Sequence, residues 1–371
     1  MGKPGRNELC WCGSGKKYKG CHLGRSKQTR IPLWDVASKV RANMKGQLCL
    51  APDTLRASCS KGIVRAHTVA RASLRTIAES DRVYAFNLDL MAIAKHQGQT
   101  VPELFGVNAA SVFTGFCSVH DNQIFAPLEK TDFSGSAEQC FLLGYRALVR
   151  ELFAKQGAAK SIPLLKDMDR GRPVQDQIAM QRFFEVYSGG TAAGLGALET
   201  YKAECDRYLK EHDFSRVRYY IVELGAPPDV MCSAGLFPEC DFNGRQLQDC
   251  WPSDPLPDSL WISTVGWPGR GALVFTWLEG HDRACRQFIG SLDGLPDIAI
   301  QHAVVRLLFE HFENIFLAPR WWRSLSDSTR QRLLQRHQVA ADPMMPREPT
   351  CLIDDGVRAV SWKVTRRVTM L

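Results

Sequence analysis

Long apolar segments are missing from this sequence of 371 residues, in which no run approaches the roughly 18 apolar residues of a membrane-spanning helix. Its first residues, "MGKPGR", are charged and lack the apolar core of a secretory signal. We therefore expect a cytoplasmic protein with no membrane partner. The composition, 45% hydrophobic and 23% charged, is that of an ordinary globular protein, and the length allows two or three domains.

An even-numbered, regularly spaced set of cysteines, which is typical of a disulfide framework, is missing as well. The 13 cysteines are odd in number and scattered along the chain. Without an export signal, we interpret them as reduced thiols or metal ligands and do not expect a framework of disulfide bonds. Cys232, Cys240 and Cys250 have no close pair among them, so this group is not assigned to a metal site.

Acidic residues are almost absent from residues 1–30, where eight Lys or Arg side chains accompany Glu8 alone. This segment carries a net charge of +7, nearly all of the +8 of the whole chain. Such a segment suits the phosphate backbone of a nucleic acid or an acidic protein surface, and a solvated tail without a partner has the same composition. The candidate contacts to nucleic acid are Lys16, Lys17, Lys19 and Arg25.

Four candidate metal ligands lie in the same segment. A Cys-x-Cys pair, Cys10 and Cys12, precedes the pair Cys21 and His22, and the glycines between them permit sharp turns. Three thiolates and one imidazole are a usual ligand set for structural zinc. Because so short a segment has almost no apolar core, we expect zinc binding to supply its folding free energy.

This stretch resembles the SEC-C motif, known from the C-terminal tail of the bacterial preprotein translocase ATPase. The matching residues are Gly5-Arg6-Asn7, Cys10-x-Cys12-Gly13-Ser14-Gly15-Lys16-Lys17-Tyr18 and Cys21-His22. The sequence departs from the motif at Leu9 and Trp11, where the family usually has prolines, and keeps all four ligands. The resemblance implies a zinc knuckle over residues 1–25 that docks to a protein partner.

Residues 31–130 hold a second group of candidate ligands. Cys49 and Cys59 come first, and "IVRAHTVARASLRTIA" (63–78) then indicates a short strand that carries His67 and leads into a helix. In "GFCSVHDNQIFAPLE" (115–129), Cys117 and His120 form a Cys-x-x-His knuckle that opens another helix.

The order of these elements resembles a treble-clef HNH-type, or ββα-metal, nuclease, in a form similar to an uncharacterised bacterial group that pairs such a module with a SEC-C knuckle. The resemblance implies that His67 is the general base and that Asp121 binds a catalytic Mg²⁺ or Mn²⁺. It also implies a structural zinc ion bound by Cys49, Cys59, Cys117 and His120.

Some alternatives to the nuclease interpretation stay open. The Cys-x9-Cys spacing of the first pair departs from the Cys-x2-Cys that is usual in the family. His67 could therefore be a zinc ligand itself, with Cys49 merely buried. The module could also be a zinc scaffold without chemistry, or the likeness a coincidence.

Beyond residue 130 the sequence contains no catalytic constellation. An apolar stripe predicts an amphipathic helix over 136–156, capped by Ser136, with Arg146 on its solvated side. A second helical region is expected over 174–212, in which "SGGTAAGLG" (188–196) either breaks the helix or permits close packing. After residue 217 the expected elements are strands at 217–225, 260–267 and 272–280, a loop at 226–259, a helix at 297–317 and an edge strand at 357–368.

These patterns predict an α+β fold in four parts: a zinc knuckle (1–25), an HNH-like zinc module (31–130), a helical region (131–216) and an α+β domain with an antiparallel sheet (217–371). The leading hypothesis is a metal-dependent nuclease that cleaves phosphodiester bonds, with a role in bacterial antiphage defence. The alternative is a non-catalytic zinc protein that docks to nucleic acid or protein. Both hypotheses expect one or two structural zinc ions.

Overall fold

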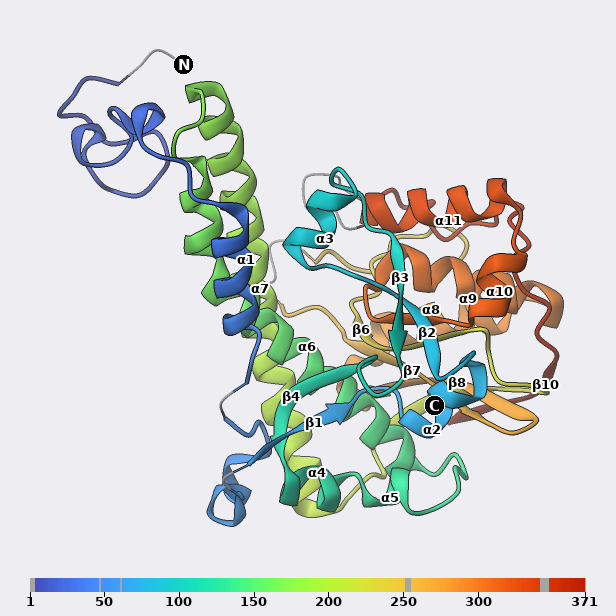
Figure 1. The fold of residues 1–371 in the computed structure, drawn as a ribbon. Coiled ribbons are helices and arrows are strands. Elements are labelled where there is room, and N and C mark those ends of the chain that lie inside the picture. Colours follow the sequence, from blue (N-terminus) through green and yellow to red (C-terminus); the bar gives the residue numbers. More distant parts are fainter. Residues whose placement is uncertain (1–3, 47, 61, 251–254, 341–346, 371) are drawn as a thin grey trace.

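The protein has an α+β fold built around a large antiparallel sheet, as predicted (Figure 1). The computed structural model describes residues 4–46, 48–60, 62–250, 255–340 and 347–370. The eight strands follow the order β10-β5-β8-β7-β6-β9-β2-β3, and every neighbouring pair is antiparallel. Their bounds are β2 Arg82–Phe86, β3 Pro102–Gly106, β5 Val217–Leu224, β6 Val230–Leu236, β7 Leu260–Trp267, β8 Arg270–Leu278, β9 Ile315–Leu317 and β10 Val364–Met370.

The central strands of this sheet are buried on both faces. Side chains alternate between the faces of a strand, so a strand buried on both is apolar at nearly every position. In β5, Tyr220, Val222 and Leu224 join one core, whereas Tyr219 and Ile221 join the other. The molecule therefore has three layers, with the sheet between two groups of helices.

One group of helices covers the first face. It consists of α2 Arg71–Ile77, α8 Asp282–Asp293, α9 Asp297–His311, α10 Pro319–Ser324 and α11 Asp327–Ala340. Helix α9 is apolar around most of its surface and is buried from Ile300 to Glu310, as expected for a helix enclosed on all sides. None of the helices in the described ranges has both the length and the apolarity needed to cross a membrane.

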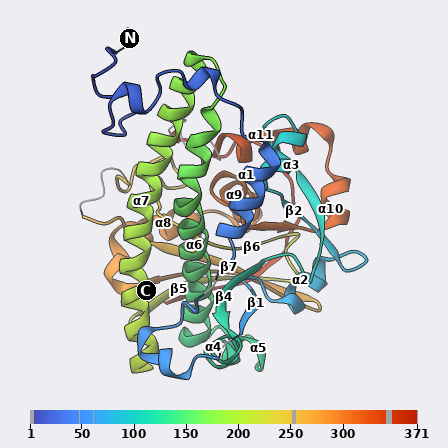
Figure 2. The same ribbon diagram turned by 60° about the vertical axis from the view of Figure 1, so that its left-hand side comes forward.

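Two long helices, α6 Ala137–Lys166 and α7 Val174–Glu211, cover the other face. The side chain of Ser136 accepts a hydrogen bond from the backbone N–H of Gln139 and caps α6. The two helices run side by side beyond the sheet and form an arm, whose tip carries the N-terminal segment (Figures 1 and 2). Helix α1 Leu33–Asn43 packs along α6 on this arm.

A second, two-stranded sheet lies beside the base of the arm. Strands β1 Ile63–His67 and β4 Val112–Cys117 pair antiparallel, and β4 leads directly into α4 Ser118–Ile124 and α5 Ala126–Glu129. The segment between β1 and β4 forms α2, β2, α3 Leu90–Lys95 and β3, which lie outside this small sheet. The large sheet therefore takes strands from both 31–130 and 217–371, while the division into four domains stays a prediction.

Several expected elements differ from the structure. The range 226–259 is not all loop, because β6 pairs with β7 and β9 within it. The helix expected over 297–317 ends at His311, and the last three residues of that range form β9. The stretch 188–196 does not break α7, which runs without interruption from 174 to 211. Each difference depends on packing partners that are distant in sequence.

Candidate metal centres

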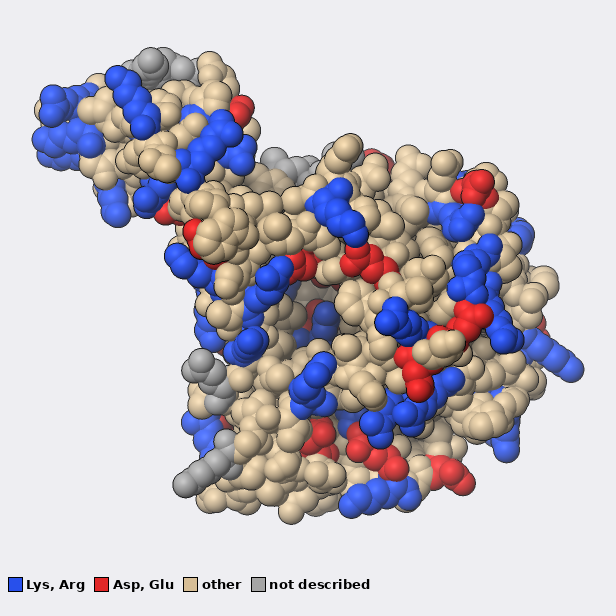
Figure 3. Space-filling model, viewed as in Figure 1, with Lys and Arg blue, Asp and Glu red and all other residues tan. Residues whose placement is uncertain are grey.

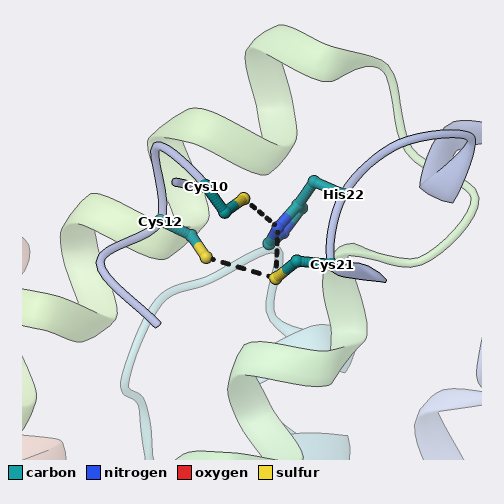
Figure 4. A group of neighbouring side chains, drawn as sticks. All are labelled: Cys10, Cys12, Cys21 and His22. Carbon is teal, nitrogen blue, oxygen red and sulfur yellow. Dashed lines mark hydrogen bonds between the residues drawn. The ribbon is translucent and has the colours of Figure 1, made fainter. Parts of the chain in front are cut away.

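The four ligand candidates of the N-terminal segment converge on one point (Figure 4). The Sγ atoms of Cys10 and Cys21 each lie 3.2 Å from Nδ1 of His22, and the Sγ atoms of Cys12 and Cys21 are 3.5 Å apart. All four ligand atoms lie within 4.8 Å of one another. This set of three sulfurs and one nitrogen fits a tetrahedral zinc ion.

A tight backbone turn brings the two halves of this knuckle together. The N–H of Cys10 donates to the carbonyl of Lys16 over 2.8 Å, and Leu9 forms an isolated bridge with Lys17. Gly13 and Gly15 have φ angles of 72° and 69°, in the left-handed region that favours glycine. Glycines at these positions therefore let the chain reverse between the ligand pairs.

The knuckle is attached to the tip of the arm through its histidine. Nε2 of His22 lies 2.9 Å from Oδ2 of Asp169, a fully buried residue in the turn between α6 and α7. Arg25 donates to both Asp167 and Asp169, and Gln181 of α7 donates to Asp169 over 2.8 Å. A carboxylate that accepts the outer N–H of a histidine ligand fixes the tautomer of the ring, so Nδ1 faces the metal site.

The central ligand candidates also converge. The Sγ atoms of Cys49, Cys59 and Cys117 each lie 3.4 Å from Nδ1 of His120, and all four ligand atoms lie within 4.8 Å of one another. On the outer side of the ring, Nε2 of His120 is 3.0 Å from the hydroxyl of Ser58. The geometry thus favours Cys49 as a ligand and leaves His67 outside the group.

The thiols of both groups need a cation to ionise together. In the central group, burial raises the pKa of the Cys117 thiol, but hydrogen bonds from the backbone of His120 and from Ser60 bring it down to about 6. Burial and the neighbouring Cys49 raise the pKa of Cys59 to about 11. Without a metal, ionisation of one thiol therefore makes ionisation of its neighbours less favourable. A divalent ion removes this repulsion by neutralising the negative charge of the thiolates.

The proposed catalytic residues do not touch each other. His67 ends β1, and its Nε2 lies 3.2 Å from the carbonyl of Val107; burial lowers its pKa, so the ring is neutral near pH 7. Asp121, in the first turn of α4, is half-buried, and burial raises its pKa. In the described chain no hydrogen bond or ion pair joins the two side chains.

Arg146, on α6, was predicted wrongly to lie on a solvated face of its helix. It is buried, with 1% of its surface exposed, and not on a solvated face of α6. Its guanidinium lies 4.0 Å from the ring centre of Phe125 and 2.7 Å from a carboxylate oxygen of Glu129. Its charge influences both His67 and Asp121. The helical period of the sequence could not reveal that Arg146 is buried, because α5 covers the side of α6 on which the sequence is polar.

The candidate nucleic-acid contacts fall into two sets. Lys16, Lys17 and Lys19 are exposed on the knuckle. Arg25 was predicted to join them, but its side chain is only 12% exposed and is bound to the two aspartates at the tip of the arm. The structure therefore assigns Arg25 to holding the knuckle in place.

Comparison with known proteins identifies this part of the chain as a metal-binding SEC-C motif, which matches residues 6–24. The same stretch is similar to "Protein translocase subunit SecA" of Pseudomonas savastanoi pv. phaseolicola, with 85% identity over 20 residues, or 5% of this chain and 2% of that protein. The corresponding protein of Chloroflexus aurantiacus is 75% identical over 24 residues, or 6% of this chain and 2% of its own length.

The chain thus spans about 2% of the length of these curated relatives, and the similarity concerns the motif alone. No solved structure matches the chain.

Proposed function

We propose that this protein is a zinc-stabilised cytoplasmic docking protein, whose SEC-C knuckle binds the phosphate backbone of a nucleic acid. The observation that supports this proposal is the division of charge on the knuckle. The inward Arg25 is neutralised by Asp167 and Asp169, whereas the lysines at 16, 17 and 19 face solvent. On the face drawn in Figure 3, basic side chains crowd the lobe that projects from the body. A projecting cluster of this kind can approach a backbone without obstruction.

Salt-dependent binding tests this proposal. Replacing Lys16, Lys17 and Lys19 with Gln should weaken binding of a labelled RNA or DNA duplex and lower the slope of log K against log salt by about 3, because each phosphate contact contributes about one unit. Fluorescence anisotropy at several salt concentrations measures both quantities.

The matched control replaces three exposed lysines elsewhere, Lys160, Lys210 and Lys363, with Gln. This variant should bind as the unchanged protein does. Equal losses in the two variants would mean that net charge, and not the knuckle, drives binding. Binding of an acidic protein in place of nucleic acid would favour the protein-docking alternative.

A nuclease is the second candidate function. It is favoured by the order β1, β4, α4 around the central metal group and by the state of His67. Because Nε2 of His67 donates to the carbonyl of Val107, Nδ1 of the neutral ring, which has no hydrogen-bond partner among the described residues, can accept a proton from water. A role in antiphage defence would depend on such an activity and stays a prediction.

The residues near Asp121 fit a catalytic Mg²⁺ or Mn²⁺ poorly. One oxygen of Asp121 is buried without a partner among the described residues, but its nearest charged neighbours are Arg146 and Glu129, which are bound to each other. A hard divalent cation prefers several oxygen ligands and is repelled by an arginine. The residues around Asp121 therefore do not support a cleavage step that depends on such an ion.

Replacing His67 with Ala tests the nuclease candidate. If His67 is a general base, the variant should lose cleavage of DNA or RNA by at least about 100-fold and keep its zinc content, since His67 lies outside both ligand groups. Cleavage is followed on labelled single- and double-stranded substrates with Mg²⁺ or Mn²⁺. Cleavage that survives the substitution would exclude His67 as the base.

A further inference from the structure

A deep cavity separates the arm from the body of the molecule. It encloses about 550 Å³ between α6, α1, β2 and the segment that links α9 to β9. Figure 3 shows its mouth near the centre of that face, with acidic and basic side chains inside. Neighbouring cavities of about 300 and 590 Å³ share Lys155 with it. Such a size is typical of small-molecule sites, which enclose roughly 300–1,000 Å³.

Most of the wall is apolar and small side chains leave the space open. Ala154 and Ala158 follow one another at helical spacing along α6, and Phe86, Phe105 and Phe316 contribute aromatic surface. On α7, Gly189 and Gly190 border the space beside Lys155, and a Cβ atom at Gly190 would meet nothing within 4 Å. A glycine inside a helix is less stable than an alanine there, and no close packing explains Gly190.

The polar end of the cavity holds two charges without a direct partner. Arg150 and Glu151 pair with each other over 2.6 Å. Lys155 and Glu313 also influence each other electrostatically, yet neither side chain forms a hydrogen bond or ion pair with any described residue. Although the Glu313 side chain is exposed, desolvation by the surrounding protein raises the pKa of its carboxyl group, and the charges of Arg150 and Lys155 offset part of this rise.

The segment that carries Glu313 is held firmly. The adjacent Asn314 is buried, and its Nδ2 donates to Thr68 over 3.1 Å and to the carbonyl of Ser233 over 2.6 Å. Glu313 is exposed and Lys155 is partly exposed, and both line the cavity, so a molecule inside it can reach both charged groups. The two groups are therefore placed to bind opposite charges on one molecule between them.

We infer that this cavity binds a small zwitterion with an apolar body, such as an α-amino acid with an apolar side chain. Lys155 binds its carboxylate, Glu313 binds its ammonium group, and the apolar body fills the part lined by the aromatic rings. This site is separate from both metal centres and does not depend on nucleic-acid binding.

Calorimetry with three related probes tests the inference on the full chain. L-phenylalanine carries both charges, phenylacetate lacks the ammonium group and phenethylamine lacks the carboxylate. L-phenylalanine should bind at least tenfold tighter than either of the other two. Absence of saturable binding, or tighter binding of a singly charged probe, overturns the inference without any variant.

Two substitutions then assign the charges. Lys155→Met should abolish the advantage of L-phenylalanine over phenethylamine, and Glu313→Gln should abolish its advantage over phenylacetate. The matched controls are Lys160→Met and Glu199→Gln on the exposed sides of α6 and α7, which should leave all three affinities unchanged. Binding of L-phenylalanine that is unaffected by both cavity substitutions would place the ligand elsewhere and overturn the assignment.

Discussion

At the scale of single residues, the two metal centres have the same types of ligand but differ in the hydrogen-bond partner of the histidine ligand. Each centre presents three sulfurs and one Nδ1, with the outer nitrogen of the histidine hydrogen-bonded. That partner is the carboxylate of Asp169 at the knuckle and the hydroxyl of Ser58 at the central group. A carboxylate partner raises the basicity of the ligand more than a hydroxyl does, so Asp169 should strengthen metal binding from another part of the chain.

Asp169→Asn tests this role. The amide keeps the size of the side chain but removes its charge, so we expect zinc affinity at the knuckle to fall about 10–100-fold. Competition with a coloured chelator measures the affinity of each centre. Asp167→Asn is the control, because Asp167 binds Arg25 and not His22. Equal effects of the two substitutions would indicate that the salt bridges to Arg25, and not the histidine contact, stabilise the site.

At the scale of elements, the arm depends on glycines that serve different purposes. In α6, Gly144 permits close packing on the sheet, because a Cβ atom there would lie 3.2 Å from Trp261. In α7, Gly190 lies at an open cavity. Both helices continue through these residues since their apolar faces are buried against the sheet and against each other. Tertiary packing thus outweighs the low helix propensity of glycine.

Alanine at these two positions should have opposite effects on stability. Gly190→Ala should raise the free energy of unfolding by about 0.5–1 kcal/mol, because alanine has less conformational freedom to lose in the unfolded chain. Gly144→Ala should lower it by about 1–3 kcal/mol, because the added methyl group overpacks the contact with Trp261. Chemical denaturation followed by circular dichroism gives both values. Destabilisation by Gly190→Ala would mean that the cavity wall is tighter than described.

At the scale of the whole molecule, the two metal centres lie at opposite ends of the pair of long helices. The knuckle sits at the tip of the arm, and the central group lies beside α4 at its base (Figures 1 and 2). Cys49 of the central group packs against the core on the α6 side of the sheet, whereas neither core includes a ligand of the knuckle. Because the two centres lie far apart, each should gain or lose its ion independently of the other.

Elemental analysis of the purified protein should find two zinc ions per chain. Cys21→Ser should remove one of them and Cys59→Ser the other, with the sheet still folded by circular dichroism, because each ion contributes folding free energy only to its own segment. A single zinc ion that is lost in Cys21→Ser would leave the central group without a metal. In that case the interpretation of residues 49–120 as a zinc module would be wrong.

Much of this organisation was predictable from local sequence. The SEC-C ligands follow from short spacings, and the strands at 217–225, 260–267 and 272–280 follow from apolar runs, because such signals are complete within a few residues. Strand β6, with its small residues, and the three-residue β9 carry weak signals and form only because neighbouring strands pair with them. The edge strand of the tail begins at Val364, later than expected, and pairs with β5.

The sequence by itself determined which residues can bind metal, where the positive charge is concentrated, and that the fold combines helices with an antiparallel sheet. Only the tertiary structure decided what these residues face. It turned Arg25 inward to Asp169, buried Arg146 beside Glu129, and placed Lys155 and Glu313 in the wall of one cavity. Each of these arrangements joins residues from separate elements, and the spacing within one segment contains no information about its partner on another.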